Sequence, residues 1–293
     1  MNTPNRPFKN TKEKYDILLN IIGMHGSAVV AFSGGVDSTL LAYAAAEALG
    51  RENMFCVTAR ALSFPERELK DAVDFCEEHG IRHEVVDFDE LGVAGFAENP
   101  PNRCYLCKRA LFSVFKTLAK EKGFEVVFEG SNTDDASDYR PGMQAVRELG
   151  IKSPLKEAGL AKEEIRAVLK ELGLPVWEKP PLACLSTRFP YGEDITAEKL
   201  KMVGKAEQFL FDKGFKHIRV RFHGNNNYTA RIETTPGVIA ELAAEPIRGE
   251  TDRYFKELGF TWVALDLAGY RMGSMNEGLS EKDRENEKHS SKD

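Results

Sequence analysis

Long apolar segments are missing from this sequence. No apolar run approaches the roughly 20 residues that a membrane-spanning helix needs. The first residues, MNTPNRPFKNTKEK, contain no apolar core of the kind that secretory signal peptides carry. We therefore expect neither a membrane protein nor a secreted one, and the cytoplasm is the expected location.

Basic segments are missing too. The net charge is −6 and the isoelectric point is about 5.7, with no block of Lys or Arg. Extended binding to tRNA or DNA is not favoured by such a balance. The five cysteines, an odd number, argue against a disulfide framework in a cytosolic chain and point to metal binding, catalysis or burial.

Strand and helix patterns alternate over the first two thirds of the chain. Residues 28–32 have the composition of a buried strand, and 54–58, 83–88 and 124–129 also have strand patterns. Helical patterns cover 12–24, 37–49, 65–78, 104–121 and 161–172. This order predicts an α/β fold with a parallel, doubly wound sheet, whose ligands bind at the carboxyl ends of the strands.

The pattern changes near Asp194. A helix over 196–213, strands at 217–222 and 228–233, a helix over 236–258 and a strand at 261–267 predict a smaller α+β domain. We expect domains at 1–194 and 195–276. Residues 277–293 are charged and nearly free of apolar side chains, which predicts a disordered tail.

A glycine-containing turn follows the first predicted strand. It reads Ser33-Gly34-Gly35-Val36-Asp37-Ser38-Thr39 and leads directly into a helix. Glycines leave amide groups unshielded, and the positive end of the helix dipole faces the turn, so a phosphate-sized anion fits here. The lysine of a Walker motif is absent. The alternative is an ordinary tight strand-to-helix turn.

Carboxylates gather after the fourth predicted strand, in Gly130-Ser131-Asn132-Thr133-Asp134-Asp135, with Asp138 and Arg140 beyond. Carboxylates at the carboxyl end of a strand suit Mg²⁺ bound to phosphates. A polar surface turn with an Asx cap would look the same in the sequence.

Three of the five cysteines are candidates for chemistry. Cys104 and Cys107 have C-x2-C spacing at the start of a helix, which suits one metal or cluster; alone, such a pair can also be redox-active or accidental. Cys184 lies in a loop near Arg188, whose charge would favour a thiolate. Cys56 and Cys76 are expected in the core.

Arg219 and Arg221 alternate along one predicted strand and therefore share a face. Arg231 and Glu233 share a face of the next strand. Such arginines could hold a phosphate or a dicarboxylate through forked contacts. The face could equally be a solvated outer surface with paired charges, and both interpretations stay open here.

Several segments together resemble one family. They are the PP-loop from Ser33 to Ser38, the segment Asn99 to Lys108, Glu129 to Asp135 with Arg140-Pro141-Gly142, and Pro181 to Gly192, with its Ala-Cys-Leu-Ser-Thr-Arg-Phe-Pro-Tyr-Gly. They are similar to those of the LarE family, ATP-dependent sulfur transferases that help to build the nickel-pincer nucleotide cofactor. The resemblance covers roughly residues 12 to 275 and implies a PP-loop fold of the adenine nucleotide α-hydrolase type.

The resemblance implies a two-step reaction. ATP with Mg²⁺ would adenylylate a carboxylate of pyridinium-3,5-biscarboxylic acid mononucleotide, and a sulfur species would then displace AMP. It implies that Ser33, Gly34, Gly35, Asp37 and Ser38 serve the nucleotide site, where we also expect Arg188. Asp37 and Cys184 are the expected catalytic residues. From their shared strand face, we expect Arg219 and Arg221 to hold the substrate's phosphate. A homo-oligomer is also implied, since the family tends to assemble into hexamers. The acidic balance and the lack of long apolar runs predict no nucleic acid or membrane partner.

The source of sulfur is open. Cys184 matches the family's sulfur-handling cysteine, which in some members surrenders its own sulfur. With Cys104 and Cys107 also present, this chain resembles the branch that holds a [4Fe-4S] cluster on three cysteines. The alternative source is Cys184 itself, as a sacrificial sulfur donor. For the function as a whole, the alternatives are a tRNA-thiolating PP-loop enzyme and an amide synthase of the NAD or GMP synthetase kind.

Overall fold

The computed structural model describes residues 7–136, 141–181, 183–271 and 273–275. The chain forms two compact units, one made of Met1–Phe88 and Cys104–Leu182, the other of Asp89–Arg103 and Ala183–Asp293. The sequence-based boundary near Asp194 divides the chain differently, because it leaves residues 89–103 and 183–194 with the first part. The predicted tail at 277–293 lies outside the described residues, as do Asp138 and Arg140.

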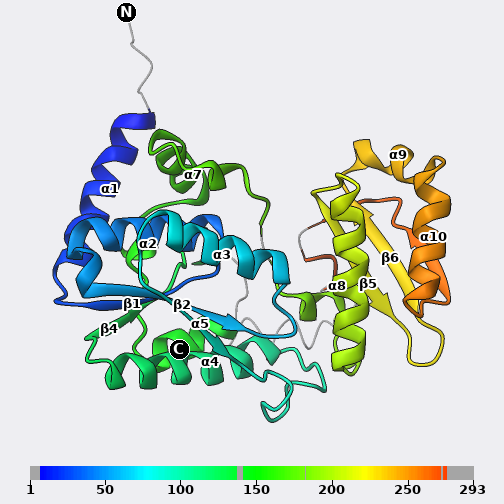
Figure 1. Cartoon of the computed structure of the whole chain (residues 1–293), viewed down its shortest axis with the longest axis horizontal. Coiled ribbons are helices and arrows are strands. Elements are labelled where there is room, and N and C mark those ends of the chain that lie inside the picture. The colour runs from blue at the N-terminus through cyan, green and yellow to red at the C-terminus, as the bar shows by residue number, and fades with distance from the viewer. Residues whose placement is uncertain (1–6, 137–140, 182, 272, 276–293) are drawn as a thin grey trace, which may run out of the picture. The chain divides into compact units, whose positions relative to one another are not determined.

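The first unit is built on a four-stranded parallel sheet (Figure 1). Its strands have the order β3-β2-β1-β4. The chain moves outward from β1 through β2 to β3 and then returns to the other side of β1, so the direction of winding reverses between β1 and β4. Ligands of open α/β sheets bind at such a reversal, outside the carboxyl ends of the strands. The strands are β1 (Ala28–Ala31), β2 (Met54–Arg60), β3 (His83–Asp87) and β4 (Val126–Phe128).

Helices cover both faces of this sheet (Figure 1). One apolar cluster joins the sheet to the side of α1, α2, α3 and α7 and includes Leu40, Cys56 and Cys76. A second cluster lies on the side of α4 and α5 and includes Phe112 and Val146. The helices are α1 (Pro7–Gly23), α2 (Val36–Leu49), α3 (Glu66–Glu78), α4 (Arg103–Glu121), α5 (Pro141–Glu148), α6 (Pro154–Glu157) and α7 (Lys162–Glu171).

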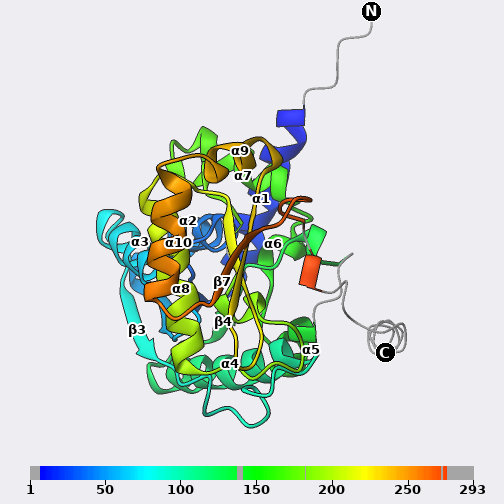
Figure 2. The same ribbon diagram turned by 90° about the vertical axis from the view of Figure 1, so that its right-hand side faces the viewer.

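The second unit has a three-stranded sheet of order β5-β6-β7, in which β5 and β6 are antiparallel and β6 and β7 are parallel. Helices α8 and α10 pack beside it and against each other, where Phe209 stacks on Tyr254 (Figure 2). The elements are α8 (Ala197–Asp212), β5 (Ile218–His223), β6 (Thr229–Thr234), α9 (Ile239–Ala243), α10 (Ile247–Glu257) and β7 (Trp262–Leu265).

The predicted fold class is confirmed, a parallel α/β sheet followed by a smaller α+β part. The single helix predicted over 236–258 is wrong, because the chain forms two helices that stop and restart around Pro246. A proline has no amide hydrogen and restricts the residue before it, so it interrupts a helix. The structure also adds helices at α5 and α6, which the sequence reasoning did not predict. Short 3-10 turns lie at Arg51–Asn53, Thr133–Ala136, Pro175–Glu178, Leu185–Arg188 and Pro236–Val238.

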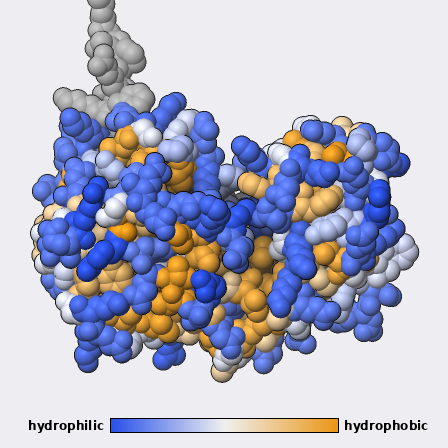
Figure 3. Space-filling view, in the orientation of Figure 1, coloured by the Kyte–Doolittle hydropathy of each residue, from blue (hydrophilic) through white to orange (hydrophobic). Residues whose placement is uncertain are grey.

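On the face drawn in Figure 3, each unit shows hydrophilic side chains with apolar patches between them. Among the described residues, no helix is both long enough and apolar enough to cross a membrane.

Candidate functional site

The turn after β1 has the backbone geometry that an anion site requires. Gly34 has a φ of +64°, and a Cβ atom there would lie 3.3 Å from atoms of Ala72 on α3, so only glycine fits without strain. Gly35 caps α2 in an extended conformation and has no side chain to bond the first helical amides. Those amides and the positive end of the helix dipole are therefore available to a ligand.

Serine side chains close the same turn. Ser38 Oγ accepts a hydrogen bond from the Ser33 amide at 3.2 Å and donates one to the Gly35 carbonyl at 3.2 Å. The hydroxyls of Ser33 and Ser38 are 3.1 Å apart. The predicted residues Ser33, Gly34, Gly35 and Ser38 thus form one compact loop.

Asp37 lies at the start of α2 and has two polar partners from other elements. Its Oδ2 is 2.5 Å from Lys162 Nζ, at the start of α7. Its Oδ1 accepts a hydrogen bond from Asn132 Nδ2 at 3.3 Å. Both charged side chains keep about a quarter of their surface exposed (24% for Asp37 and 29% for Lys162), so a ligand can reach them.

The segment after β4 touches the loop after β1. A Cβ atom at Gly130 would lie 3.2 Å from the Ser38 amide nitrogen, which explains a glycine at this position. Carboxylate oxygens of Asp134 and Asp135 accept hydrogen bonds from the amides of Lys162 and Asn132, at 2.9 and 3.0 Å. Both carboxylates therefore organise the turn, as the Asx-cap alternative describes, and a role as Mg²⁺ ligands stays a prediction.

Two lysines at this site escaped the sequence reasoning. Lys162 pairs with Asp37. Lys179 Nζ lies 2.6 Å from Glu68 Oε2, 2.7 Å from Asp71 Oδ2 and 3.2 Å from the Gly34 carbonyl oxygen. Nothing in the local sequence distinguishes these lysines from ordinary surface residues, because their partners are more than 100 positions away.

The three candidate cysteines are divided between the two units. Cys104 and Cys107 are half-buried and lie three residues apart on α4, a spacing that places neighbouring side chains on one helix face. Cys184 is half-buried and belongs to the second unit. Within the described residues, no group of three His, Cys, Asp or Glu side chains forms a metal site. Cys56 and Cys76 are completely buried, which confirms their prediction as core residues.

Asn99 fixes the segment that precedes Cys104. It is fully buried and has a φ of +53°, and its side-chain amide donates to the Pro190 carbonyl at 2.6 Å. Its side-chain oxygen accepts a hydrogen bond from Arg103. The Gly192 amide donates to the Asn99 carbonyl at 3.0 Å. The residues before Cys104 and those after Cys184 are thus joined within the second unit.

Arg188 is buried in an ion pair. Its Nε and Nη2 donate to the two carboxylate oxygens of Glu207, at 2.7 and 3.1 Å. Burial raises the pKa of Glu207, but the Arg188 charge and hydrogen bonds outweigh burial and hold that pKa below its usual range. Arg188 also donates to the Cys184 carbonyl at 3.4 Å. In this geometry Arg188 orients the loop that carries Cys184.

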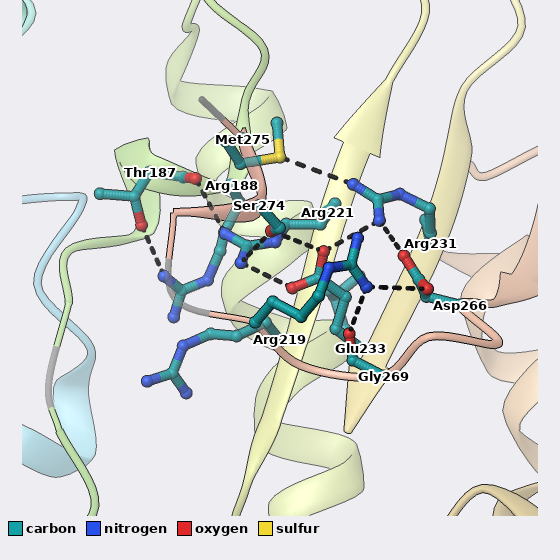
Figure 4. Close-up of polar contacts among 12 residues, drawn as sticks. Thr187, Arg188, Arg219, Arg221, Arg231, Glu233, Asp266, Gly269, Ser274 and Met275 are labelled. Atoms are coloured by element: carbon teal, nitrogen blue, oxygen red, sulfur yellow. Dashed lines mark hydrogen bonds and ion pairs between the residues drawn. The ribbon is translucent and has the colours of Figure 1, made fainter. Parts of the chain in front are cut away.

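Arg221 and Arg231 of the second sheet gather on the face opposite the apolar side, around a fully buried carboxylate, Glu233 (Figure 4). Arg221 Nη2 is 2.6 Å from Glu233 Oε2, and Arg231 Nη1 is 2.9 Å from its Oε1. Ser274 bridges Glu233 and Arg221, and Asp266 pairs with Arg231. This face is charged and paired, but Arg221 and Glu233 are buried, so it is not a solvated surface.

Two groups of this face remain suited to a ligand. Within the described residues, Arg221 Nε is buried and makes no hydrogen bond, which is uncommon for a buried donor. Arg219 points away from the group around Glu233 (Figure 4) and lies over the Tyr270 ring at 5.4 Å. Burial, with Arg188 nearby, lowers the pKa of Arg219. A bound anion would relieve that electrostatic cost.

Comparison with known proteins extends over both units. Residues 17–198 match the NAD synthase family model. An uncharacterised protein of Synechocystis is 43% identical over 269 residues, covering 92% of this chain and 99% of its own length. The pyridinium-3,5-bisthiocarboxylic acid mononucleotide synthase of Lactiplantibacillus plantarum is 38% identical over 251 residues, covering 86% and 89%. The glutamine-hydrolysing GMP synthase of Aeropyrum pernix is 28% identical over 203 residues, covering 62% of this chain and 39% of its own length.

Proposed function

The chain belongs to the family of pyridinium-3,5-bisthiocarboxylic acid mononucleotide synthases, the LarE family, and we propose that it converts a carboxylate of pyridinium-3,5-biscarboxylic acid mononucleotide to a thiocarboxylate. It is an ATP-dependent enzyme with a PP-loop, as its match to the NAD synthase family also indicates. The observation that carries the proposal is the turn after β1, where the first amides of α2 have no side-chain cap. Asp37, at the same helix start, contacts Lys162 and Asn132.

The first step activates the substrate. A carboxylate oxygen attacks the α-phosphorus of ATP, a bond to that oxygen forms, and pyrophosphate leaves with the electron pair of the broken P–O bond. The PP-loop amides and the Lys162 ammonium would stabilise the charge on the leaving pyrophosphate. We propose that Mg²⁺ accompanies these phosphates and that Asp37 helps to place it.

The second step transfers sulfur. A sulfur nucleophile attacks the acyl carbon of the mixed anhydride, and AMP leaves. Adenylylation is needed because a carboxylate is a poor electrophile, whereas AMP is a good leaving group. We propose that Arg219 and Arg221 hold the substrate's phosphate, supported by the buried, unbonded Nε of Arg221.

We propose that Cys104, Cys107 and Cys184 hold a [4Fe-4S] cluster. The spacing of Cys104 and Cys107 on α4 fits two thiolate ligands of one cluster. With three protein thiolates, such a group would supply one iron for binding sulfide. The chain's own residues would fix the thiols. Arg188 holds the Cys184 carbonyl, and Asn99 fixes the residues that lead into Cys104.

We further propose a cytoplasmic homo-oligomer, such as a hexamer, as the working form. Its size can be measured by light scattering of the purified protein.

The test uses protein purified without oxygen. Exchange of labelled pyrophosphate into ATP should depend on the biscarboxylic acid mononucleotide, and sulfide should then give a thiocarboxylate with stoichiometric AMP. The relation to NAD synthase makes amide formation the main competing outcome. If ammonia, rather than a sulfur donor, is consumed and an amide appears, the sulfur-transfer proposal is wrong. Bound tRNA in the purified protein would favour a tRNA-thiolating enzyme instead.

A further inference from the structure

Lys179 contacts the backbone of the PP-loop from the side of α3. Its ammonium group donates hydrogen bonds to Asp71 Oδ2 at 2.7 Å and to the Gly34 carbonyl oxygen at 3.2 Å. Glu68 Oε2 lies 2.6 Å from the same ammonium group and forms an ion pair with it. The two carboxylates lie three residues apart on α3 and hold the ammonium group in one place.

The backbone of Lys179 is fixed as well. Arg166 on α7 donates to the Lys179 carbonyl at 2.7 Å and also to the Trp177 carbonyl. The Lys179 side chain is only 16% exposed. Little freedom is left for this lysine, so it acts as a rigid contact to the loop rather than as a mobile surface charge.

The contact determines which way one peptide group faces. The peptide bond between Gly34 and Gly35 is trans, so its carbonyl and its N–H point in opposite directions. Glycines at both positions would let this peptide rotate easily. A carbonyl held by Lys179 on the α3 side directs the Gly35 N–H away from α3, into the loop where an anion is expected.

We propose that Lys179 is a positioning residue of the nucleotide site, which orients the Gly34–Gly35 peptide so that its N–H binds a phosphate oxygen of ATP or pyrophosphate. The inference rests on the proposed nucleotide site at the PP-loop. Lys179 itself does not contact the nucleotide in this arrangement. It acts through the peptide, and Glu68 and Asp71 act through Lys179.

The sequence offers a direct measurement. Gly34–Gly35 is the only Gly–Gly pair in the chain. Protein labelled with glycine carrying ¹³C at the carbonyl and ¹⁵N at the amide therefore gives a single carbonyl-to-amide NMR correlation, that of the Gly35 N–H. This signal reports the orientation of the peptide and the binding of inorganic pyrophosphate, without substrate or turnover.

The variants are Lys179→Met, Lys179→Arg and, as a matched control, Lys70→Met. Lys70 lies on α3 and pairs with Asp74 at 2.5 Å, so the control removes a lysine ion pair from the same helix without touching the loop. We expect Lys179→Met to displace the Gly35 signal and to weaken pyrophosphate binding about tenfold, the effect of losing one charge-assisted contact. Lys179→Arg should restore part of the affinity, and Lys70→Met should behave as wild type.

The outcomes separate the two proposals. If pyrophosphate does not move the wild-type signal, the nucleotide site itself is wrong. If pyrophosphate moves the signal equally in wild type and Lys179→Met, with equal affinity, only the role of Lys179 is overturned. Should Lys179→Met fail to fold, Asp71→Asn replaces it, since Asp71 is 54% exposed and tolerates change. That variant should shift the Gly35 signal in the same direction by a smaller amount, and an unmoved signal counts against the proposal.

Discussion

Lys162 Nζ lies 2.5 Å from Asp37 Oδ2, although the two residues are 125 positions apart. The pair joins the first turn of α2 to the first turn of α7, beside the PP-loop. The other carboxylate oxygen of Asp37, Oδ1, accepts a hydrogen bond from Asn132, which follows β4. The two oxygens of Asp37 therefore bond to two different segments of the chain. A phosphate arriving at the loop would compete with Asp37 for the Lys162 ammonium group. We infer that ATP binding loosens this ion pair.

We predict that Asp37→Ala abolishes most ATP–pyrophosphate exchange and leaves the fold intact, because the Asp37 side chain is partly exposed. Lys162→Met should lower exchange roughly 100-fold, as expected for the loss of a charge that stabilises a leaving group. Because the two side chains act as a unit, the double variant should be little worse than either single one. Exchange assays with circular dichroism of each variant measure this.

The matched control is Lys14→Met. Lys14 pairs with Glu164 of α7 at 2.7 Å, so the control removes a lysine ion pair from the same helix without removing a partner of Asp37. Its exchange rate should match wild type. Unchanged exchange in a folded Asp37→Ala protein would contradict the assignment of the nucleotide site.

We predict different effects for the two arginines of β5. Either Arg219→Ala or Arg221→Ala should raise the KM for the mononucleotide and leave the affinity for ATP nearly unchanged. Arg221→Ala should also lower the free energy of unfolding by about 3 kcal/mol, because it removes a partner from the buried Glu233. Arg219→Ala should lower the free energy of unfolding by less than half of that amount. Urea unfolding and substrate-dependent exchange separate the two effects.

An arginine at the edge of the same unit gives the comparison. Arg248 makes an exposed ion pair with Glu245 at 2.5 Å, and Arg248→Ala should change neither KM nor stability measurably. A collapse of ATP affinity in Arg219→Ala would show that this face has been misassigned.

We predict that alanine at Cys104, Cys107 or Cys184 reduces both iron content and sulfur transfer, whereas adenylylation persists. The reason is that a cluster with three protein ligands cannot be held well by two. Alanine at Cys56, which is fully buried in the first unit, is the control and should leave iron content unchanged. Mössbauer spectra of protein prepared without oxygen provide the measurement.

Mass spectrometry provides the opposing result. Conversion of Cys184 to dehydroalanine during turnover, with an active Cys104→Ala variant, would make Cys184 a sacrificial sulfur donor and would rule out the cluster.

We predict that His223 makes the second unit less stable in mild acid. Burial, with Arg231 and Arg221 close by, lowers the pKa of His223, and Arg231 Nε donates to its Nε2 at 3.1 Å, which requires a neutral ring. The unfolded chain therefore binds more protons between the folded pKa and the ordinary value near 6.5, so stability falls as the pH drops through that window. His223→Gln, which keeps a side-chain acceptor, should lose less melting temperature than wild type between about pH 7.5 and about pH 5.5.

His83 has a lowered pKa as well, caused by burial, and serves as the comparison. His83→Gln should remove a separate part of the loss of melting temperature in acid. If His223→Gln and wild type lose equal melting temperature, the ring of His223 is not the group that titrates.

The parallel sheet could be predicted because its two central strands, 28–31 and 54–60, are short and largely apolar runs between turn residues. The PP-loop was predictable because its glycines and hydroxyls are consecutive. Strand alternation correctly placed Arg219 and Arg221 on one face. It could not show which carboxylate they meet, because pairing depends on the register between β5 and β6.

Other features depend on contacts that sequence spacing does not reveal. Lys162 and Lys179 became part of the site only when α7 and the following turn packed beside the PP-loop. The break before α10 could have been predicted from Pro246. The apolar pattern continues at helical spacing on both sides of this proline, which led to a single predicted helix. Arg188, expected at the nucleotide or the thiol, also bonds to Glu207, a residue 19 positions away on α8, and local spacing did not reveal that partner.

The path of the chain between the two units limits how the protein can be divided. It passes from the first unit to the second after Phe88, returns at Cys104 and crosses again after Leu182. A single cut at any position therefore leaves at least one unit without part of its own chain. A fragment ending at Asp194, for example, would keep Asn99 with Pro190 but lose Ile195, whose amide bonds to the Ala97 carbonyl at 2.7 Å. Exchange of one unit with that of a relative would need three junctions, so the two units are expected to be inherited together rather than shuffled as separate modules.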